Sequence, residues 1–210
     1  MENKINKIIK IFSEKYPNPE SALNYKNEFE LLIATILSAQ TTDKQVNKVT
    51  KTLFKKYKSP EDFADLTPKE LQKEIKSIGL YKNKSKYIIK TAKKLISDFS
   101  SKVPDNRKDL MELSGVGRKT ANVVLSCAFT KDAIPVDTHV FRLANRIGLA
   151  DTDKVREVEE ELMKVIPQKF WSKMHHWLIF HGREVCKAQN PLCNNCEITT
   201  YCDYYKQNRI

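Results

Sequence analysis

The sequence predicts an all-α protein. Apolar residues recur three and four positions apart along nearly the whole chain, which is the spacing of one face of an α-helix. No segment of several residues alternates between apolar and polar side chains, as a half-buried strand would. The 210 residues contain only five glycines and no Gly/Ser-rich linker. If the chain forms two lobes, we therefore expect them to share helices across a cleft.

The N-terminal half is expected to hold amphipathic helices around one buried helix. Residues 29–37 are apolar on nearly all sides and predict the buried helix. The amphipathic stripes are Ile5, Ile8, Ile9 and Phe12, then Val46, Val49, Leu53, Phe54 and Tyr57, then Ile88, Ala92, Leu95 and Phe99. The expected helix starts are a capping box of Thr42 with Gln45, a Ser59-Pro60 start, and a capping box of Thr67 with Glu70 around Pro68.

The C-terminal half continues the helical pattern up to a group of cysteines. Its stripes are Val140, Phe141, Ala144 and Ile147, then Val155, Val158, Leu162 and Val165. A last long helix is expected over residues 171–185.

The charge balance favours a polyanionic partner. Lys and Arg number 37 and Asp and Glu 26, so the net charge is +11. Nucleic acid is the commonest partner of so basic a chain, although a merely soluble, Lys-rich surface would have the same balance. The N-terminus lacks the apolar core of a signal peptide, and the most apolar stretch, residues 31–39, is too short to cross a bilayer. The sequence therefore predicts a soluble, cytoplasmic protein with no membrane partner.

Residues 107–126 indicate two helices joined by a tight turn. The first helix is expected to end near Leu113 and the second to begin near Gly117. Glycines in the turn permit positive φ and a close approach of the backbone to a ligand, and the first amides of the second helix can bind a phosphate oxygen. The expected binding set is Gly115, Val116, Gly117, Arg118 and Thr120. The pattern is typical of a helix–hairpin–helix DNA-binding motif, with an ordinary interhelical turn as the alternative.

Lys119 and Asp137 are the candidate catalytic residues. Lys119 lies in the first turn of the second helix, where the helix dipole and the adjacent Arg118 disfavour its ammonium form. An uncharged lysine amine is a nucleophile, whereas a charged one would simply grip a phosphate. Asp137 is placed to start the next helix, where an aspartate is most often an N-cap. Its alternative role is a carboxylate beside a sugar that develops positive charge.

Four cysteines near the C-terminus predict an inorganic centre. Cys186, Cys193, Cys196 and Cys202 follow the pattern Cys-x6-Cys-x2-Cys-x5-Cys. In a reducing compartment clustered cysteines are metal ligands more often than disulfides. The spacing lacks the paired short knuckles of most zinc sites and favours a [4Fe–4S] cluster, with zinc as the alternative. The fifth cysteine, Cys127, lies in an apolar run and is predicted to be a small, buried hydrophobic residue.

Several separate motifs, in the same order, resemble the endonuclease III family of DNA glycosylase/AP lyases. They are FELLIATILSAQTTD, IGLYKNKSKYI, LSGVGRKTA, VDTHVFR and the cysteine spacing, and the resemblance covers roughly residues 5 to 205. It implies a lobe of residues 22–132 that contains the hairpin (107–126), and a lobe of residues 1–21 and 133–210 that holds the [4Fe–4S] cluster (186–202). By the same resemblance the cluster is structural or helps to position DNA.

The resemblance also implies an activity. A base-excision repair enzyme of this family flips a damaged base out of double-stranded DNA, and Lys119 would remove it through a Schiff base, aided by Asp137. The strand is then cut 3′ to the abasic site by β-elimination. Gln40 resembles the residue that fills the gap left by the base, with a polar residue at a helix end as the alternative. Ile78 or Leu80 would wedge the duplex, or both would belong to the core, and His139 would contact the DNA backbone or serve in packing or capping. Oxidised or ring-saturated pyrimidines are the expected substrates, and a monomer associated with the nucleoid is the expected form.

The chain departs from the family pattern at two places. Ser114 replaces the usual proline of the hairpin turn, and the turn should survive because both glycines remain. Lys187 is the only basic residue between the first two cysteines, where relatives tend to carry more. Two other readings stay open: a glycosylase without lyase activity, which a lysine at position 119 argues against, and a non-catalytic DNA-structure binder or redox sensor.

Overall fold

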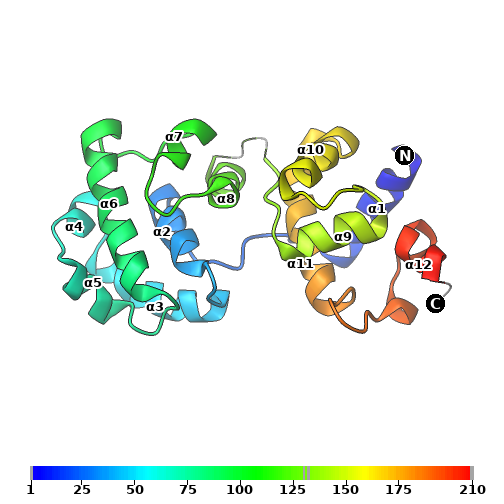
Figure 1. Cartoon of the computed structure of the whole chain (residues 1–210), viewed down its shortest axis with the longest axis horizontal. Helices are drawn as coiled ribbons and strands as arrows, with labels where there is room; N and C mark the ends of the chain where they lie inside the picture. Colours follow the sequence, from blue (N-terminus) through cyan, green and yellow to red (C-terminus); the bar gives the residue numbers. More distant parts are fainter. Residues whose placement is uncertain (1, 130, 132, 209–210) are drawn as a thin grey trace. The chain divides into compact units, whose positions relative to one another are not determined.

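All regular structure among the residues that the computed structural model describes is helical, which confirms the predicted all-α fold. The structure describes residues 2–129, 131 and 133–208. The α-helices are α1 (Glu2–Lys15), α2 (Glu28–Ser38), α3 (Asp43–Lys56), α4 (Pro60–Ala64), α5 (Pro68–Glu74), α6 (Tyr81–Phe99), α7 (Arg107–Met111), α8 (Arg118–Ala128), α9 (Thr138–Ile147), α10 (Val155–Val165), α11 (Trp171–Glu184) and α12 (Asp203–Asn208) (Figure 1). Short 3-10 helices are η1 (Gln168–Phe170), η2 (Cys193–Asn195) and η3 (Thr199–Tyr201).

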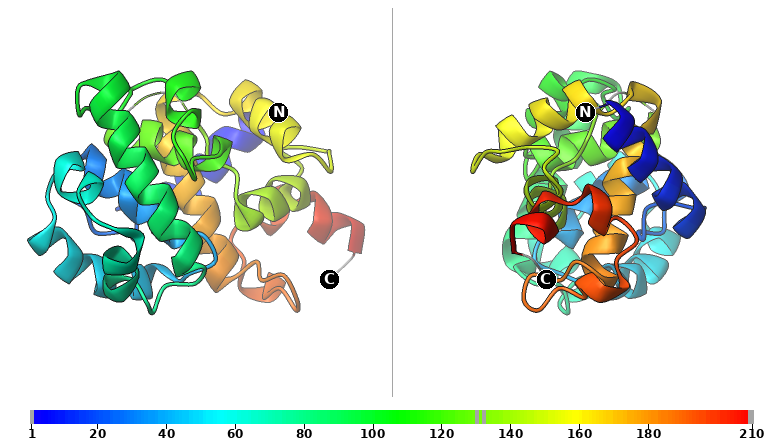
Figure 2. Two further views of the ribbon diagram at one scale, coloured as in Figure 1. Left: turned by 60° about the vertical axis from the view of Figure 1, so that its left-hand side comes forward. Right: turned by 90° about the vertical axis from the view of Figure 1, so that its right-hand side faces the viewer.

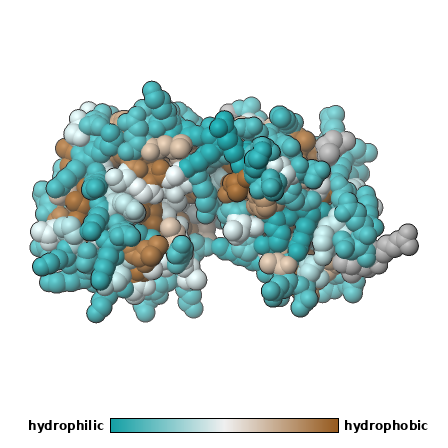
Figure 3. Space-filling view, viewed as in Figure 1, coloured by the Kyte–Doolittle hydropathy of each residue, from teal (hydrophilic) through white to brown (hydrophobic). Residues whose placement is uncertain are grey.

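The chain folds into two compact units, one continuous and one made from both ends of the chain. The continuous unit comprises residues 21–131, and the other combines residues 1–20 with residues 132–210. Hydrophilic side chains cover most of the visible face of each unit (Figure 3). None of the helices in the described part of the chain has the length and apolar character needed to span a membrane.

Helix α2 is the centre of the unit formed by residues 21–131. Every residue from Phe29 to Leu37 is buried, as the unbroken apolar run predicts. Helices α3, α6 and α8 pack against α2, and α6 lies beside it in Figures 1 and 2. Helices α4 and α5 pack in turn on α6. This packing fixes the end of α2 and the start of α6 relative to each other, and with them the loops that adjoin these helix ends.

The second unit has a core to which both ends of the chain contribute. Helix α9 packs against α10, α11 and α12. The predicted stripe of α1 is buried in this core together with Trp177 of α11, which is 1% exposed. The Nε1 of Trp177 donates to the carbonyl of Tyr16 at 3.0 Å, so α11 is tied to the segment that follows α1.

Most predicted helix starts are confirmed, and three local expectations are wrong. Ser59 and Thr67 head complete capping boxes, with Asp62 and Glu70 as partners. Thr42 caps α3 as expected, but the Gln45 side chain donates to Ser77 Oγ at 2.7 Å instead of returning to the cap.

The other two corrections concern a helix end and a helix start. Helix α7 ends at Met111, short of the predicted Leu113, because the chain tightens there into turns. Val155 is 54% exposed, because it is the first residue of α10 and lies before the helix meets the core.

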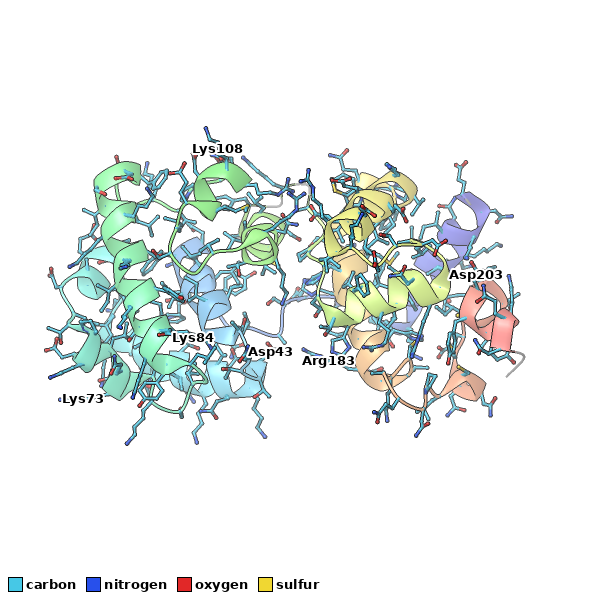
Figure 4. All side chains as sticks on the ribbon, viewed as in Figure 1. Asp43, Lys73, Lys84, Lys108, Arg183 and Asp203 are labelled. Carbon is cyan, nitrogen blue, oxygen red and sulfur yellow. The ribbon has the colours of Figure 1, made fainter. Side chains whose placement is uncertain are left out.

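Gly148 joins three helices of the second unit. It ends α9 with a φ of +79°, which favours glycine. Lys4 of α1 donates to the Ile147 carbonyl at 2.6 Å and pairs with both carboxylate oxygens of Asp203 at 3.0 Å. A Cβ on Gly148 would lie 1.8 Å from Asp203 Oδ2, so no other residue fits without moving α12 (Asp203 is labelled in Figure 4).

Replacing Gly148 with alanine should destabilise the protein. The positive φ and the displaced Lys4–Asp203 pair together cost about 2 kcal/mol or more of unfolding free energy. Urea unfolding of Gly148→Ala checks this value. Gly117→Ala is the matched control, because its Cβ meets nothing within 4 Å, and its stability should stay within about 1 kcal/mol of the wild type. Equal stability of Gly148→Ala and wild type would contradict the steric argument.

Candidate functional site

The turn between α7 and α8 presents backbone amides at the surface. Gly115 has a φ of +80°, and a Cβ there would lie 3.1 Å from the Cβ of Tyr87. Val116 is buried under the turn, and its amide donates to the carbonyl of Leu113 at 3.1 Å. Gly117 caps α8 without a side-chain oxygen, so the amides of the first helical turn have no intrahelical acceptor. The turn thus has the geometry of an anion site.

Serine at position 114 leaves the turn intact, as expected. Its carbonyl accepts a hydrogen bond from Thr91 Oγ1 at 2.8 Å, so α6 holds the turn from behind. Tyr87, one helical turn before Thr91, packs on Gly115 from the same helix. The departure from the family pattern therefore does not alter the backbone that would meet a phosphate.

Lys119 lies in the first turn of α8, as predicted. Its side chain is exposed, whereas Arg118 and Thr120 on either side are half-buried. Within the unit 21–131, no described carboxylate pairs with the Lys119 amine. The positive end of the α8 dipole lies beside it. The amine is thus accessible to a substrate and lies next to the open amides of the turn.

Asp137 is the N-cap of α9, as its position predicts. A single oxygen, Oδ1, accepts from the amides of His139 at 2.9 Å and Val140 at 2.8 Å. The side chain is half-buried. Because Oδ1 alone serves as the cap, Oδ2 remains available for another role.

His139 lies between Arg142 and α11. Its Nδ1 is 3.2 Å from Nη2 of Arg142. Burial lowers the pKa of His139, and the nearby arginines lower it further against the opposing effect of Asp137. A Cβ on Gly182 would lie 3.0 Å from Nδ1, so α11 packs directly against this pair. His139 is therefore a neutral donor near neutral pH.

Gln40 and Leu80 lie at the tips of two adjoining loops. Both adopt positive φ, 53° at Gln40 and 58° at Leu80, and both are exposed. A Cβ on Gly79 would lie 2.9 Å from the carbonyl oxygen of Gln40, so the loops touch through their backbones. Ile78 is only 2% exposed and belongs to the core, whereas Leu80 is 54% exposed. Of the two wedge candidates, the structure leaves only Leu80 at the surface.

The four C-terminal cysteines line one cavity. Val185 and Leu192 add apolar walls to it. Burial raises the pKa of Cys196 to about 11, and it also raises the pKa of Cys193 and Cys202. In each case a neighbouring cysteine raises it further. Thiolates are therefore disfavoured here without a counter-charge, and a cationic inorganic core would supply that charge.

Two arginines of α9 fasten the start of the cysteine segment, and sequence reasoning missed both. Arg142 donates to the carbonyl of Cys186 at 2.9 Å and to that of Gly182 at 3.0 Å. Arg146 donates to the carbonyls of Lys187 and Ala188 at 2.7 and 2.9 Å, and its Nη1 lies 3.4 Å from Cys186 Sγ. Their spacing of four residues places both on one face of α9. No sequence signal separates them from ordinary surface arginines.

The predicted site residues divide between the two units. Gln40, the hairpin and Lys119 belong to the unit 21–131, whereas Asp137, His139 and the cysteines belong to the other unit. Within each unit the predicted residues lie at the ends of helices or in the loops between them.

Comparisons of the sequence with a family model and with known proteins point to the same family. Residues 33–168 match the family described as "HhH-GPD superfamily base excision DNA repair protein". Endonuclease III of Rickettsia conorii is 54% identical over 201 residues, which cover 96% of each chain. Endonuclease III of Escherichia coli is 47% identical over 191 residues, which cover 91% of this chain and 90% of that one.

A solved structure shares the fold over the whole chain. It is described as a trapped endonuclease III–DNA covalent intermediate in an estranged-adenine complex. Its TM-score is 0.93 at 46% sequence identity, and the match covers 100% of this chain and 99% of that one. The helical architecture, the open hairpin and these relatives agree, and the chain belongs to the endonuclease III family within the HhH-GPD superfamily of base excision DNA repair proteins.

Proposed function

We propose that this DNA glycosylase and AP lyase of base excision repair acts through a Schiff base at Lys119. The observation that carries the proposal is the exposed Lys119 amine, which lies beside the open amides of the hairpin turn. A relative of the same fold has been trapped as a covalent intermediate with DNA. A nucleophilic amine next to a phosphate-binding turn is what such an intermediate requires.

The reaction proceeds on a nucleotide that has left the stack, because the sugar is out of reach inside a duplex. The lone pair of Lys119 Nζ forms a bond to the anomeric carbon, and the glycosidic bond breaks with its electron pair going to the base. The base takes up a proton and the lysine nitrogen loses one. Asp137, with Oδ2 uncommitted, stabilises the cationic sugar or accepts the proton of the amine.

Strand cleavage follows from the same covalent bond. The sugar ring opens to an iminium with Lys119, which acidifies the neighbouring carbon–hydrogen bond. Loss of that proton pushes electrons toward the 3′ carbon, and the 3′ carbon–oxygen bond breaks with the phosphate as leaving group. Water then hydrolyses the Schiff base and frees the lysine. The sequence of steps consumes no electrons from outside.

We propose distinct DNA contacts for the remaining site residues. The open amides at the start of α8, from Gly117 to Thr120, bind a phosphate of the damaged strand, Gly115 and Val116 shape the turn around it, and a ring N–H of His139 donates to the backbone. Gln40 occupies the gap left by the flipped base and Leu80 enters the stack from the adjoining loop. Neither side chain needs to give up a core contact, because both are exposed.

We propose that the cysteines hold a [4Fe–4S] cluster. Cys186, Cys193, Cys196 and Cys202 all face one cavity, which is the observation that supports the fit. Over the described ranges 2–129, 131 and 133–208, no three His, Cys, Asp or Glu side chains converge closely enough to hold a single metal ion. Four thiolates around a larger body suit a cluster better than zinc. When bound, the cluster supplies structural cross-linking of residues 186–202 rather than base-excision chemistry.

The proposed cellular setting follows from the substrate. We propose that a monomer acts on damaged double-stranded DNA in the cytoplasm, in association with the nucleoid. One copy carries the hairpin, the amine, the carboxylate and both loop tips, so the chemistry calls for no second chain.

Duplexes that each contain one defined lesion provide the test of the proposed function. Cleavage should occur at thymine glycol and at an abasic site at least about tenfold faster than at 8-oxoguanine or undamaged thymine. Denaturing gels read the nicked strand without added base, so nicking also reports the lyase step. Base release without nicking would indicate a glycosylase that lacks lyase activity. Binding without either reaction would indicate a DNA-structure binder.

A further inference from the structure

A lysine is buried at the point where α2 ends. Lys84 of α6 is 3% exposed, and its Nζ donates to the carbonyls of Leu37 at 2.8 Å and Ala39 at 2.5 Å. A third bond reaches Thr41 Oγ1 at 3.2 Å. No acidic side chain in the described part of the chain pairs with this ammonium, and burial lowers its pKa. Figure 4 shows Lys84 near the N-terminal end of α6.

The fold alone gives no reason for a charge at this position. Transfer of an ammonium from water into a protein interior is strongly unfavourable before its new partners are counted. The carbonyls at the end of a helix can be satisfied by water or by the chain's own turn, and α3 ends in that way. The second unit also has a lysine at a helix end, Lys4, but that residue has Asp203 as its counter-ion. Lys84 has only neutral oxygens.

Those oxygens belong to the segment that carries Gln40. Ala39 precedes Gln40 and Thr41 follows it, so the ammonium grips the chain on both sides of this residue. A left-handed conformation is unfavourable for a residue other than glycine, and Gln40 is held in it. The hydrogen bonds from Lys84 give this strained tip a fixed support.

The same contacts reach the loop that carries Leu80. Thr41 Oγ1 accepts a bond from the amide of Gly79 at 3.2 Å as well as the bond from Lys84. Leu80, also in the left-handed region, is the N-cap of the helix to which Lys84 belongs. Lys84 is therefore the point where the end of α2, the Gln40 tip and the Leu80 tip meet.

We infer that Lys84 is a positioning residue, which fixes the two DNA-inserting tips as one preformed wedge. The inference rests on the proposed function, because it assumes that Gln40 and Leu80 enter the duplex. Insertion into a stack requires both tips at a set separation before contact, since ordering them at that moment would lower the affinity for the opened duplex. Lys84 itself touches neither DNA nor the reacting atoms.

The test compares Lys84→Met with Lys84→Arg and with Lys93→Met. Methionine keeps the length and removes the donors, arginine restores a cation with donors, and Lys93 is an exposed lysine nine residues further along α6, on its opposite side. Single-turnover cleavage of an abasic site in a duplex should slow about tenfold or more in Lys84→Met. Cleavage of the same site in a single-stranded oligonucleotide should stay within about twofold, because no stack has to be opened. Lys93→Met should match the wild type, and Lys84→Arg should recover most of the lost rate.

A fluorescent base reports insertion directly. With 2-aminopurine opposite the abasic site, wild type should raise the fluorescence as the base unstacks, and Lys84→Met should give a smaller and slower rise. In a Gln40→Ala background, Lys84→Met should change the duplex rate by less than about twofold, since the residue that it positions is absent. If Lys84→Met does not fold, Thr41→Val is the variant to use. It removes the hydrogen bonds that link the two loops but leaves those from Lys84 to Leu37 and Ala39. It should slow duplex cleavage less than expected for Lys84→Met, again without slowing single-strand cleavage.

Two outcomes would overturn the inference. One is an equal loss on single-stranded and duplex substrates, which indicates damage to the chemistry or the fold. The other is an undiminished loss in the Gln40→Ala background, which indicates that Lys84 acts elsewhere. Failure of the proposed function is distinguishable, because the wild type itself would then cleave neither substrate.

Discussion

Lys119→Gln should lose glycosylase and lyase activity by about a thousandfold or more, because an amide has no lone pair that can form an iminium. Sodium borohydride gives the direct measurement. Reduction of the Schiff base by hydride converts it to a stable amine, so wild type should be joined covalently to a thymine glycol duplex. Lys119→Gln should give no such band on a denaturing gel. Its dissociation constant for damaged duplex should stay within about threefold, since the hairpin amides remain.

Matched variants separate the amine from general effects of charge. Lys73→Gln removes an exposed lysine of α5, labelled in Figure 4, and should keep full trapping. Asp137→Asn retains an oxygen for the N-cap of α9 and removes the negative charge, so it should fold with an unchanged melting temperature and release the base more slowly. A covalent band that persists in Lys119→Gln would assign the Schiff base to another amine.

Cys196→Ser should leave the protein without the proposed cluster and unfold residues 186–202. Of the four cysteines that line the cavity, Cys196 has the pKa that burial raises most, to about 11, and its Sγ lies 3.4 Å from Nε2 of His181. Wild type should contain about four iron atoms and matching labile sulfide per chain. The variant should contain almost none, and its unfolding free energy should fall by about 3 kcal/mol or more, because a bound inorganic centre contributes its binding energy to folding.

Cys127→Ala is the control for this experiment. Cys127 is the one cysteine outside the cavity in the described part of the chain, and burial raises its pKa to about 11. Its loss should leave the iron content unchanged. Limited proteolysis of Cys196→Ser should cut between Cys186 and Cys202, where Arg142 and Arg146 hold the chain in the wild type. If the wild type instead contains one zinc ion per chain and no sulfide, the four cysteines hold zinc and not an iron–sulfur cluster.

Local patterns of the sequence predict the helices because their causes are local. The stripe of α1, the buried run of α2 and the capping boxes at Ser59 and Thr67 all depend on residues within a few positions of one another. The exceptions have tertiary causes. Gln45 misses its capping role because Ser77, far along the chain, accepts its amide.

The support of the site could not be predicted in the same way. A lysine on an amphipathic helix normally lies in solvent, so Lys84 carries no sequence signal for burial against the end of α2. Gln40 and Leu80 adopt positive φ although neither is glycine, and contacts with Gly79 and Lys84, both distant in sequence from Gln40, support the conformation of the Gln40 tip. The residues that are proposed to meet the substrate lie in recognisable sequence motifs, whereas the residues that hold them depend on long-range packing.

The discontinuous unit sets an order for folding during synthesis. Helix α1 leaves the ribosome before residues 21–131, but its partners α9 and α11 leave it after them. Residues 21–131 form a continuous unit and can fold while the nascent chain is still growing. Until residues 138–184 have emerged, the apolar stripe of α1 has no core to join, and this interval is when the nascent polypeptide most needs a chaperone.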